Sequence, residues 1–364
     1  MKKWVLFPLI ALATTIIAIV ILVLLLNKKI QTENIVVVFT PTTTPIVSAT
    51  TPASDLEIPT SSLEVLYLTR VERDTITEEL ETIVKTQDPK VALNRLSELM
   101  ENDSKVLRSC HGLVHEIGHA SFQKYGFAGA VIFQNDICGS GYLHGIVEEN
   151  FGQVKDVSAT MKTICKNFDV LTIDSCYHGV GHGLMFFTEN NLPKSLELCD
   201  TYSDDKADIR CAEGVYMENF STDQQTHESA YLNKNDPAYP CAEQPAKYKS
   251  VCYFYAPIYY LSLHENQYTA ALDWCASLTE HQQTCAYGVG SRTMKYNLND
   301  PIFVENICQY NPKFTRACVD GMVSYYLVNF TSKAKGREMC KTLPERSQKN
   351  CLTSIEIRRD SIAE

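Results

Sequence analysis

Twelve of the fourteen cysteines in the chain fall into six pairs, and this pattern constrains the fold more than any other feature. Within a pair the residues lie 10 to 12 positions apart, and the first cysteines of successive pairs are 34, 42, 34, 33 and 32 residues apart. A period near 34 is typical of repeats built from two antiparallel helices. The pairs are Cys165 with Cys176, Cys199 with Cys211, Cys241 with Cys252, Cys275 with Cys285, Cys308 with Cys318, and Cys340 with Cys351. The sequence therefore predicts an all-α protein, an α/α-hairpin repeat solenoid in which each disulfide joins one helix to the next.

Two cysteines, Cys110 and Cys138, have no partner at this spacing, because Met100 stands ten residues before Cys110. We expect them to bond to each other, which makes seven disulfides. Spacing alone leaves other pairings open. Zinc knuckles are the weaker alternative, because no two cysteines lie as close together as those sites require. Persistent disulfides form in oxidising compartments, so the repeats are expected outside the cytoplasm.

The repeat region, residues 63–364, resembles tetratricopeptide and Sel1-like repeat proteins, in particular their secreted, disulfide-stapled members. The resemblance rests on the period, the paired helices and the cysteine steps. It implies a concave surface that binds a protein or peptide partner. Because repeat folds serve many activities, the resemblance implies no chemistry.

The N-terminal part has a different composition. Trp4 to Leu26 is a run of 23 uncharged, mostly apolar residues, long enough to cross a bilayer as a helix. We expect residues 1–29 to form a short cytoplasmic tip and a single-pass transmembrane signal anchor, followed at 30–62 by a linker rich in Thr, Pro and Ser. A cleaved signal peptide is the alternative, with the same topology for the rest. The expected location is the cell membrane, with the N-terminus cytoplasmic and the C-terminal domain extracytoplasmic. A net charge of −10 argues against nucleic acid as a partner.

Histidines mark the first part of the repeat region, residues 63–190, whereas 191–364 holds the regular cysteine pairs. Three histidines, His115, His144 and His182, each stand three residues after a glycine in successive repeat units. Further polar residues extend this stripe in steps of four along each expected helix, which places them on one face. In stacked repeats, equivalent positions are neighbours, so the stripes should converge. The candidate metal ligands are His111, His115, His119, His144, Glu148, His178 and His182.

The first stripe contains the sequence His-Glu-Ile-Gly-His at 115–119, which matches H-E-x-x-H. This short motif resembles that of the gluzincin peptidases. The resemblance implies His115 and His119 as zinc ligands, Glu116 as the catalytic general base and Glu148 as third ligand. A second resemblance, at the level of architecture, is to helical-repeat hydroxylases such as deoxyhypusine hydroxylase, which hold two irons between repeats.

Histidine with one or two carboxylates suits a divalent transition metal, with Zn and Fe first and Mn, Ni and Cu open. Two functions fit the sequence. One is a metal-dependent enzyme, either a hydrolase or an oxidase or hydroxylase. The other is a non-catalytic metal-binding or scaffold protein of the cell envelope. A pocket beside the histidines would favour the enzyme, and a closed ligand shell would favour a structural site.

Overall fold

A computed structural model describes residues 68–135, 137–168, 172–202, 204–221, 229–264 and 267–357. The expected anchor at 1–29 and linker at 30–62 lie outside these residues. Within the described ranges no helix is long and apolar enough to cross a membrane.

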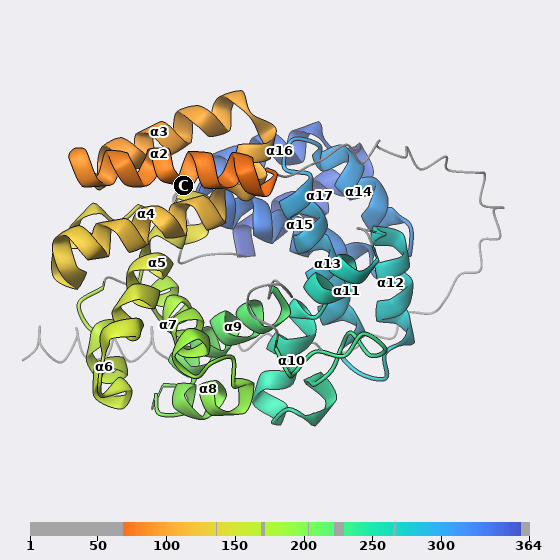
Figure 1. The fold of residues 1–364 in the computed structure, drawn as a ribbon. Coiled ribbons are helices and arrows are strands. Elements are labelled where there is room, and N and C mark those ends of the chain that lie inside the picture. The colour runs from red at the N-terminus through yellow and green to blue at the C-terminus, as the bar shows by residue number, and fades with distance from the viewer. Residues whose placement is uncertain are drawn as a thin grey trace, which may run out of the picture. The chain divides into compact units, whose positions relative to one another are not determined.

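The described chain is built from α-helices and two short 3-10 helices (Figure 1). Most helices are short and are joined by tight turns, as the hairpin pattern predicts. In chain order they are α2 (Arg70–Thr86), α3 (Pro89–Asn102), α4 (Ser104–Ala130), η1 (Val131–Phe133), α5 (Ile137–Gln153), α6 (Val157–Ile164), α7 (Ile173–Phe187), α8 (Leu192–Cys199), α9 (Asp205–Ser221), η2 (Cys241–Glu243), α10 (Ala246–Tyr255), α11 (Pro257–Leu263), α12 (Tyr268–Ser277), α13 (Gln282–Tyr296), α14 (Pro301–Gln309), α15 (Thr315–Phe330), α16 (Lys333–Thr342) and α17 (Glu345–Ile357).

The first helix of several hairpins begins at a polar side chain that caps it. Asp156 accepts a hydrogen bond from a backbone N–H in the first turn of α6, and Asn191 and Asp300 do the same for α8 and α14. Such caps satisfy N–H groups that have no partner within the helix. Helices α8 and α14 also carry proline in their first turn, where its missing N–H costs nothing.

All seven expected disulfides are confirmed, and no cysteine of the described chain is free. Six close the short hairpins, with 10 to 12 residues between the bonded cysteines, and Cys110 bonds to Cys138 across 28 residues. The half-cystines are buried, at 2% exposure or less. The bonds indicate an oxidising, extracytoplasmic environment for this domain.

Glycines let the helices of neighbouring units approach closely. A Cβ atom built on Gly145 of α5 would lie 2.1 Å from the carbonyl oxygen of His115 in α4. A Cβ on Gly181 of α7 would lie 2.0 Å from the carbonyl oxygen of Cys211 in α9. Real side chains do not approach backbone atoms this closely, so only glycine fits at these crossings. The close contact brings the stripe on α4 against α5.

The inner helices follow one another as α4, α5, α7, α9, α10, α13 and α15, and α15 then packs against α5 (Figure 1). Leu107 of α4 likewise belongs to the apolar cluster formed by α12 to α17. In an open solenoid each repeat contacts only its neighbours. Here the series of helices closes on itself, which the sequence period did not predict. In an open solenoid the inner helices would form an exposed concave face. Here these helices line a cavity instead.

Candidate metal centre

Five imidazoles from α4, α5 and α7 lie together in the interior. The expected meeting of three equivalent histidines is confirmed: the ring centroids are 5.4 Å apart for His115 and His144, 5.3 Å for His144 and His182, and 5.8 Å for His115 and His182. Potential ligand atoms lie within 4.8 Å of one another in two triads that share His144. The triads are His111, His115 and His144, and His144, His178 and His182.

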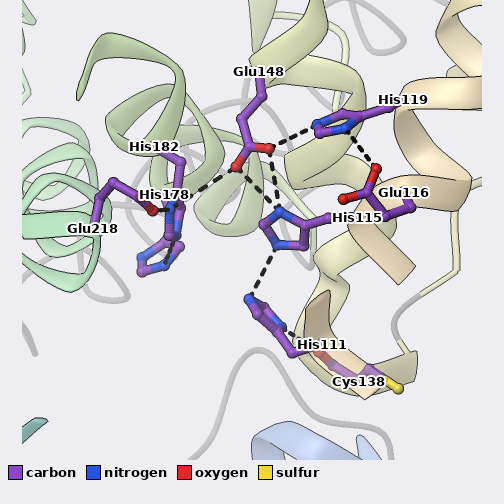
Figure 2. Close-up of polar contacts among 9 residues, drawn as sticks. All are labelled: His111, His115, Glu116, His119, Cys138, Glu148, His178, His182 and Glu218. Carbon is purple, nitrogen blue, oxygen red and sulfur yellow. Dashed lines mark hydrogen bonds and ion pairs between the residues drawn. The ribbon is translucent and has the colours of Figure 1, made fainter. Parts of the chain in front are cut away.

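The histidines of α4 and α7 form two pairs of the same construction (Figure 2). In each pair the members stand four residues apart on one helix, and their Nε2 atoms face each other. The distance is 3.1 Å between His111 and His115 and 3.1 Å between His178 and His182. Two ligands bound to one metal at about 2.0–2.1 Å lie about 3.0–3.4 Å apart for bond angles between 90° and the tetrahedral value. The nitrogen pairs therefore have the spacing of two ligands on one ion.

A carboxylate from the following helix supports the second histidine of each pair. Nδ1 of His115 lies 3.2 Å from the carboxylate of Glu148, and Nδ1 of His182 lies 2.9 Å from that of Glu218 (Figure 2). Contacts of this kind orient metal-bound histidines and fix their tautomer. The repeat thus yields two half-sites, each with two histidines on one helix and a glutamate on the next. The central imidazole of His144 lies between them.

The outer partners determine which ring nitrogens carry protons. Nδ1 of His111 lies 2.6 Å from the backbone carbonyl oxygen of Cys138, which can only accept, so this Nδ1 carries the hydrogen. Nδ1 of His115 likewise donates to the carboxylate of Glu148. In the neutral rings both facing Nε2 atoms are then bare lone pairs. Two lone pairs at 3.1 Å repel each other unless a proton or a metal cation lies between them.

Burial opposes protonation of three of the rings. Desolvation, reinforced by neighbouring histidines, holds the pKa values of His111, His144 and His178 well below the ordinary value. These rings are neutral near pH 7, which is the form that binds metals. Nδ1 of His144 is fully buried and has no hydrogen-bond partner among the described residues. A buried polar atom of this kind is costly unless something pairs with it.

The buried carboxylate of Glu148 is ionised. Burial raises the pKa of Glu148, but His115, His119 and His182 outweigh it and hold that pKa well below its usual range. For His182, burial is outweighed by Glu218, and the pKa of the imidazole is raised. Negative charge therefore lies on the outer side of the imidazole cluster, where it favours a cation at the centre.

Both histidines of the H-E-x-x-H sequence face the carboxylate of Glu148, and Nδ1 of His115 lies 3.2 Å from its Oε2 atom. Nε2 of His119 lies 2.9 Å from Glu148, and Nδ1 of His119 lies 3.4 Å from Glu116. The carboxylates of Glu116 and Glu148 outweigh burial and raise the pKa of His119 to about 10. His119 is thus held as a cation between two carboxylates. Direct binding of the metal by His119 and Glu148 stays a prediction, and so does the catalytic role of Glu116.

A local backbone turn positions the first histidine. Residues Cys138, Gly139 and Ser140, at the start of α5, have φ values of 55°, 71° and 62°. Left-handed backbone is uncommon outside glycine, and strained residues of this kind cluster at functional sites. Here the turn presents the Cys138 carbonyl to His111, and the Cys110–Cys138 disulfide ties the same segment to α4.

A cavity of about 480 Å³ adjoins the imidazole cluster. Its wall includes His111, His144 and His178, so each ligand triad borders open space. Further lining residues come from α5 and α7, and the opposite part of the wall comes from α9, α10, α13 and α15, the helices that close the circuit. This volume lies in the range of small-molecule sites.

The sequence reasoning missed part of this arrangement. Glu218 was not proposed for the site. It directly follows Met217, which stands three residues after Gly214 and so occupies the position of the striped histidines in the next unit. The Cys138 carbonyl and the cavity wall from α13 could not be found from the repeat, because they depend on a backbone turn and on closure of the helices.

Comparisons with protein-family models, with curated proteins and with solved structures find no match to this chain. The resemblance to tetratricopeptide and Sel1-like repeats therefore rests on the period and the disulfide-stapled helix pairs alone. The fold and the site define an all-helical, disulfide-stapled protein with buried histidine clusters that could hold a metal ion.

Proposed function

We propose that the protein is a metal-dependent enzyme of the extracytoplasmic space. The metal ligands are the histidines of the two triads, His111, His115, His144, His178 and His182. The observation that carries the proposal is the pair of Nε2 atoms that face each other at 3.1 Å, repeated on α4 and α7, both of them bare in the neutral rings of the α4 pair. The anchor expected at 1–29 would hold the domain at the outer face of the cell membrane.

A metal accounts for the cluster better than shared protons do. A proton could bridge one nitrogen pair, but each such bridge creates a buried imidazolium. The low pKa values of His111, His144 and His178 oppose this, and only the raised pKa of His182 favours a proton, in the α7 pair. A divalent cation in a triad would satisfy the facing nitrogen pair of that triad and a nitrogen of His144, with Glu148 or Glu218 as the outer partner. An all-nitrogen shell suits Zn or Fe, and Cu and Ni share the preference for imidazole.

The cavity favours catalysis over a purely structural role. Structural zinc sites have closed shells of four protein ligands, whereas catalytic sites keep a position for water or substrate. Three of the five histidines border the cavity, so such a position can face it. A metal in this setting acts as a Lewis acid and lowers the pKa of bound water. Among the reactions considered, hydrolysis needs only these features, and we favour it.

The test uses the full-length chain purified in detergent without chelators. We expect a stoichiometric transition metal by elemental analysis. After replacement with Co²⁺, the visible absorption bands should shift when azide is added, because azide binds an open coordination position. A Co²⁺ spectrum that azide leaves unchanged would indicate a closed, structural site.

The variant His182→Ala should lower metal affinity by at least about tenfold, because it removes a ligand. His264→Ala is the matched control, since His264 lies outside the cluster and stacks on Tyr260 at 4.3 Å. If the wild-type chain takes up none of Zn, Fe, Mn, Ni and Cu in stoichiometric amount, the proposal is wrong.

A further inference from the structure

A second wall of the cavity carries two cationic side chains that have no acidic partner among the residues that the structure describes. Arg292 and Lys295 stand three residues apart on α13, and both line the cavity. Arg292 is only 5% exposed and lies over the ring of Tyr255, 5.8 Å from its centroid. Across the described ranges, no ion pair or hydrogen bond joins either side chain to a carboxylate. Both charges are therefore directed at the cavity without compensation from the protein.

A third cation in the same cavity shows how the protein neutralises a positive charge. Nη1 of Arg210 lies 2.6 Å from Glu213, and Nε of Arg210 lies 3.5 Å from Asp174. These two carboxylates also line the cavity, but they are already paired. Arg292 lacks such a partner among the described residues although it is more deeply buried than Arg210, and so does Lys295. Arg210 thus belongs to a structural ion pair, whereas Arg292 and Lys295 are available to bind a ligand.

Leaving these charges unpaired is costly. Burial, together with the charge of Arg292, lowers the pKa of the Lys295 ammonium to about 7. A buried guanidinium cannot release its proton in the same way. Buried charges in proteins are normally paired or coordinate a ligand. An anion in the cavity would supply the missing partner for both groups.

Resting on the proposed function, we infer that Arg292 and Lys295 bind the oxyanion group of a small organic substrate, a carboxylate, phosphate or sulfate, whose reacting part lies at the histidine-held metal. His111, His144 and His178 line the same cavity as Arg292 and Lys295. One molecule within about 480 Å³ can therefore span both walls. The planar fork of Arg292 suits two oxygens of one such group.

The rest of the wall fits the organic part of such a molecule. Phe254, Tyr325 and Val328 supply aromatic and apolar surface between the two walls. Burial raises the pKa of the Tyr255 and Tyr325 hydroxyls, so both stay neutral phenols that can donate hydrogen bonds. Small-molecule sites commonly combine an apolar lining with a few placed polar groups.

The test measures binding of four probes by calorimetry: benzoate, phenyl phosphate, phenyl sulfate and the uncharged benzamide. The full-length chain is used in two states, treated with chelator and loaded with Zn²⁺. We expect at least one anion to bind the metal-free protein and benzamide to bind far more weakly. The anion that binds best identifies the oxyanion group. Because this state lacks metal, the result is independent of whether the metal site exists.

Two variants locate the binding site. Arg292→Met and Lys295→Met should each weaken binding of the preferred anion by about tenfold to a hundredfold, as expected for a lost charge-assisted contact. Lys341→Met is the matched control, because it removes the same charge from an exposed position on α16. Metal content should be unchanged in both cavity variants. If Arg292→Met does not fold, the inference is still tested by Lys295→Met and by the comparison of the anions with benzamide.

The inference fails if none of the anions binds the metal-free chain in preference to benzamide. It also fails if both cavity variants bind the anion as the wild type does. Metal uptake without anion binding would overturn this inference and leave the metal-dependent enzyme standing. Anion binding without metal uptake would retain the anion site and overturn the metal centre.

Discussion

Replacement of Glu148 by glutamine tests whether the outer carboxylates support a metal centre. Glu148 is 7% exposed, and its carboxylate lies 3.2 Å from Nδ1 of His115 and 2.9 Å from Nε2 of His119. Glutamine keeps the size of the side chain but removes its charge and one acceptor oxygen. Both histidines contact Oε2, so the amide oxygen can take that position, and the NH2 group then replaces Oε1, 3.2 Å from Nδ1 of His115, where it cannot accept a proton.

The expected effect follows from the role of such contacts. Removing an outer partner of a metal-bound histidine typically lowers metal affinity by about 10- to 100-fold, or about 1.4–2.7 kcal/mol. Glu148 supports two histidines and places a negative charge near the centre, so we expect a loss near the upper end for Glu148→Gln. Glu218→Gln should act in the same direction, because Glu218 lies 2.9 Å from Nδ1 of His182.

The assay is a competition between the protein and a chromophoric zinc chelator near neutral pH. Glu149→Gln is the control: it makes the same change one residue along α5, where the side chain contacts Gln153 outside the cluster. Its metal affinity should stay within about twofold of the wild type, as expected for a surface position. Equal affinities for Glu148→Gln and the wild type would refute the reasoning, and so would an equal loss in both variants.

Three further predictions concern stability. Gly145→Ala should destabilise the fold by about 1–3 kcal/mol or more, because the new Cβ would lie 2.1 Å from a backbone oxygen of α4. Gly152→Ala on the same helix is the control, because its new Cβ meets nothing within 4 Å and the change should be neutral or stabilising. Chemical denaturation compares the free energies of unfolding of the two variants. Because the pKa of His119 is raised to about 10, its protonated ring stabilises the fold. This contribution to the free energy of unfolding is complete below the unfolded pKa near 6.5 and is lost as pH rises to about 10. The metal-free protein should therefore lose up to about 1.4 kcal/mol per pH unit in this window, and His119→Gln should flatten the profile in a pH series of denaturation curves. Replacing Cys308 and Cys318 together by serine should cost about 2–3 kcal/mol in a denaturation experiment, with metal content unchanged.

The sequence was most informative where one repeat unit is sufficient to decide the structure. The cysteine steps identified six disulfides, because a hairpin closes over a fixed number of residues, and Cys110 and Cys138 were paired because neither has a partner at that spacing. The shared position of His115, His144 and His182 predicted their meeting, because adjacent units stack in the same way. Neither inference needs any knowledge of distant contacts.

The sequence was least informative where segments far apart in the chain meet. Packing of α15 against α5 closes the series of helices, yet no period in the sequence encodes this contact. Closure depends on small rotations between units that add up over the whole domain. Lys295 and His111, 184 positions apart in the sequence, therefore line one cavity, which could not be predicted from the repeat.

The charges of the site connect the proposed metal with the proposed anion. The carboxylates of Glu148 and Glu218, each beside one of the two histidine triads, oppose the positive charge of a cation held there. Arg292 and Lys295 then remain as positive charges that no described carboxylate contacts, and a metal nearby increases the positive potential in the cavity. An oxyanion that binds there interacts favourably with both. By linkage, metal must strengthen anion binding by the same factor as anion strengthens metal binding. The two sites thus form one electrostatic unit, in which each ligand favours the other.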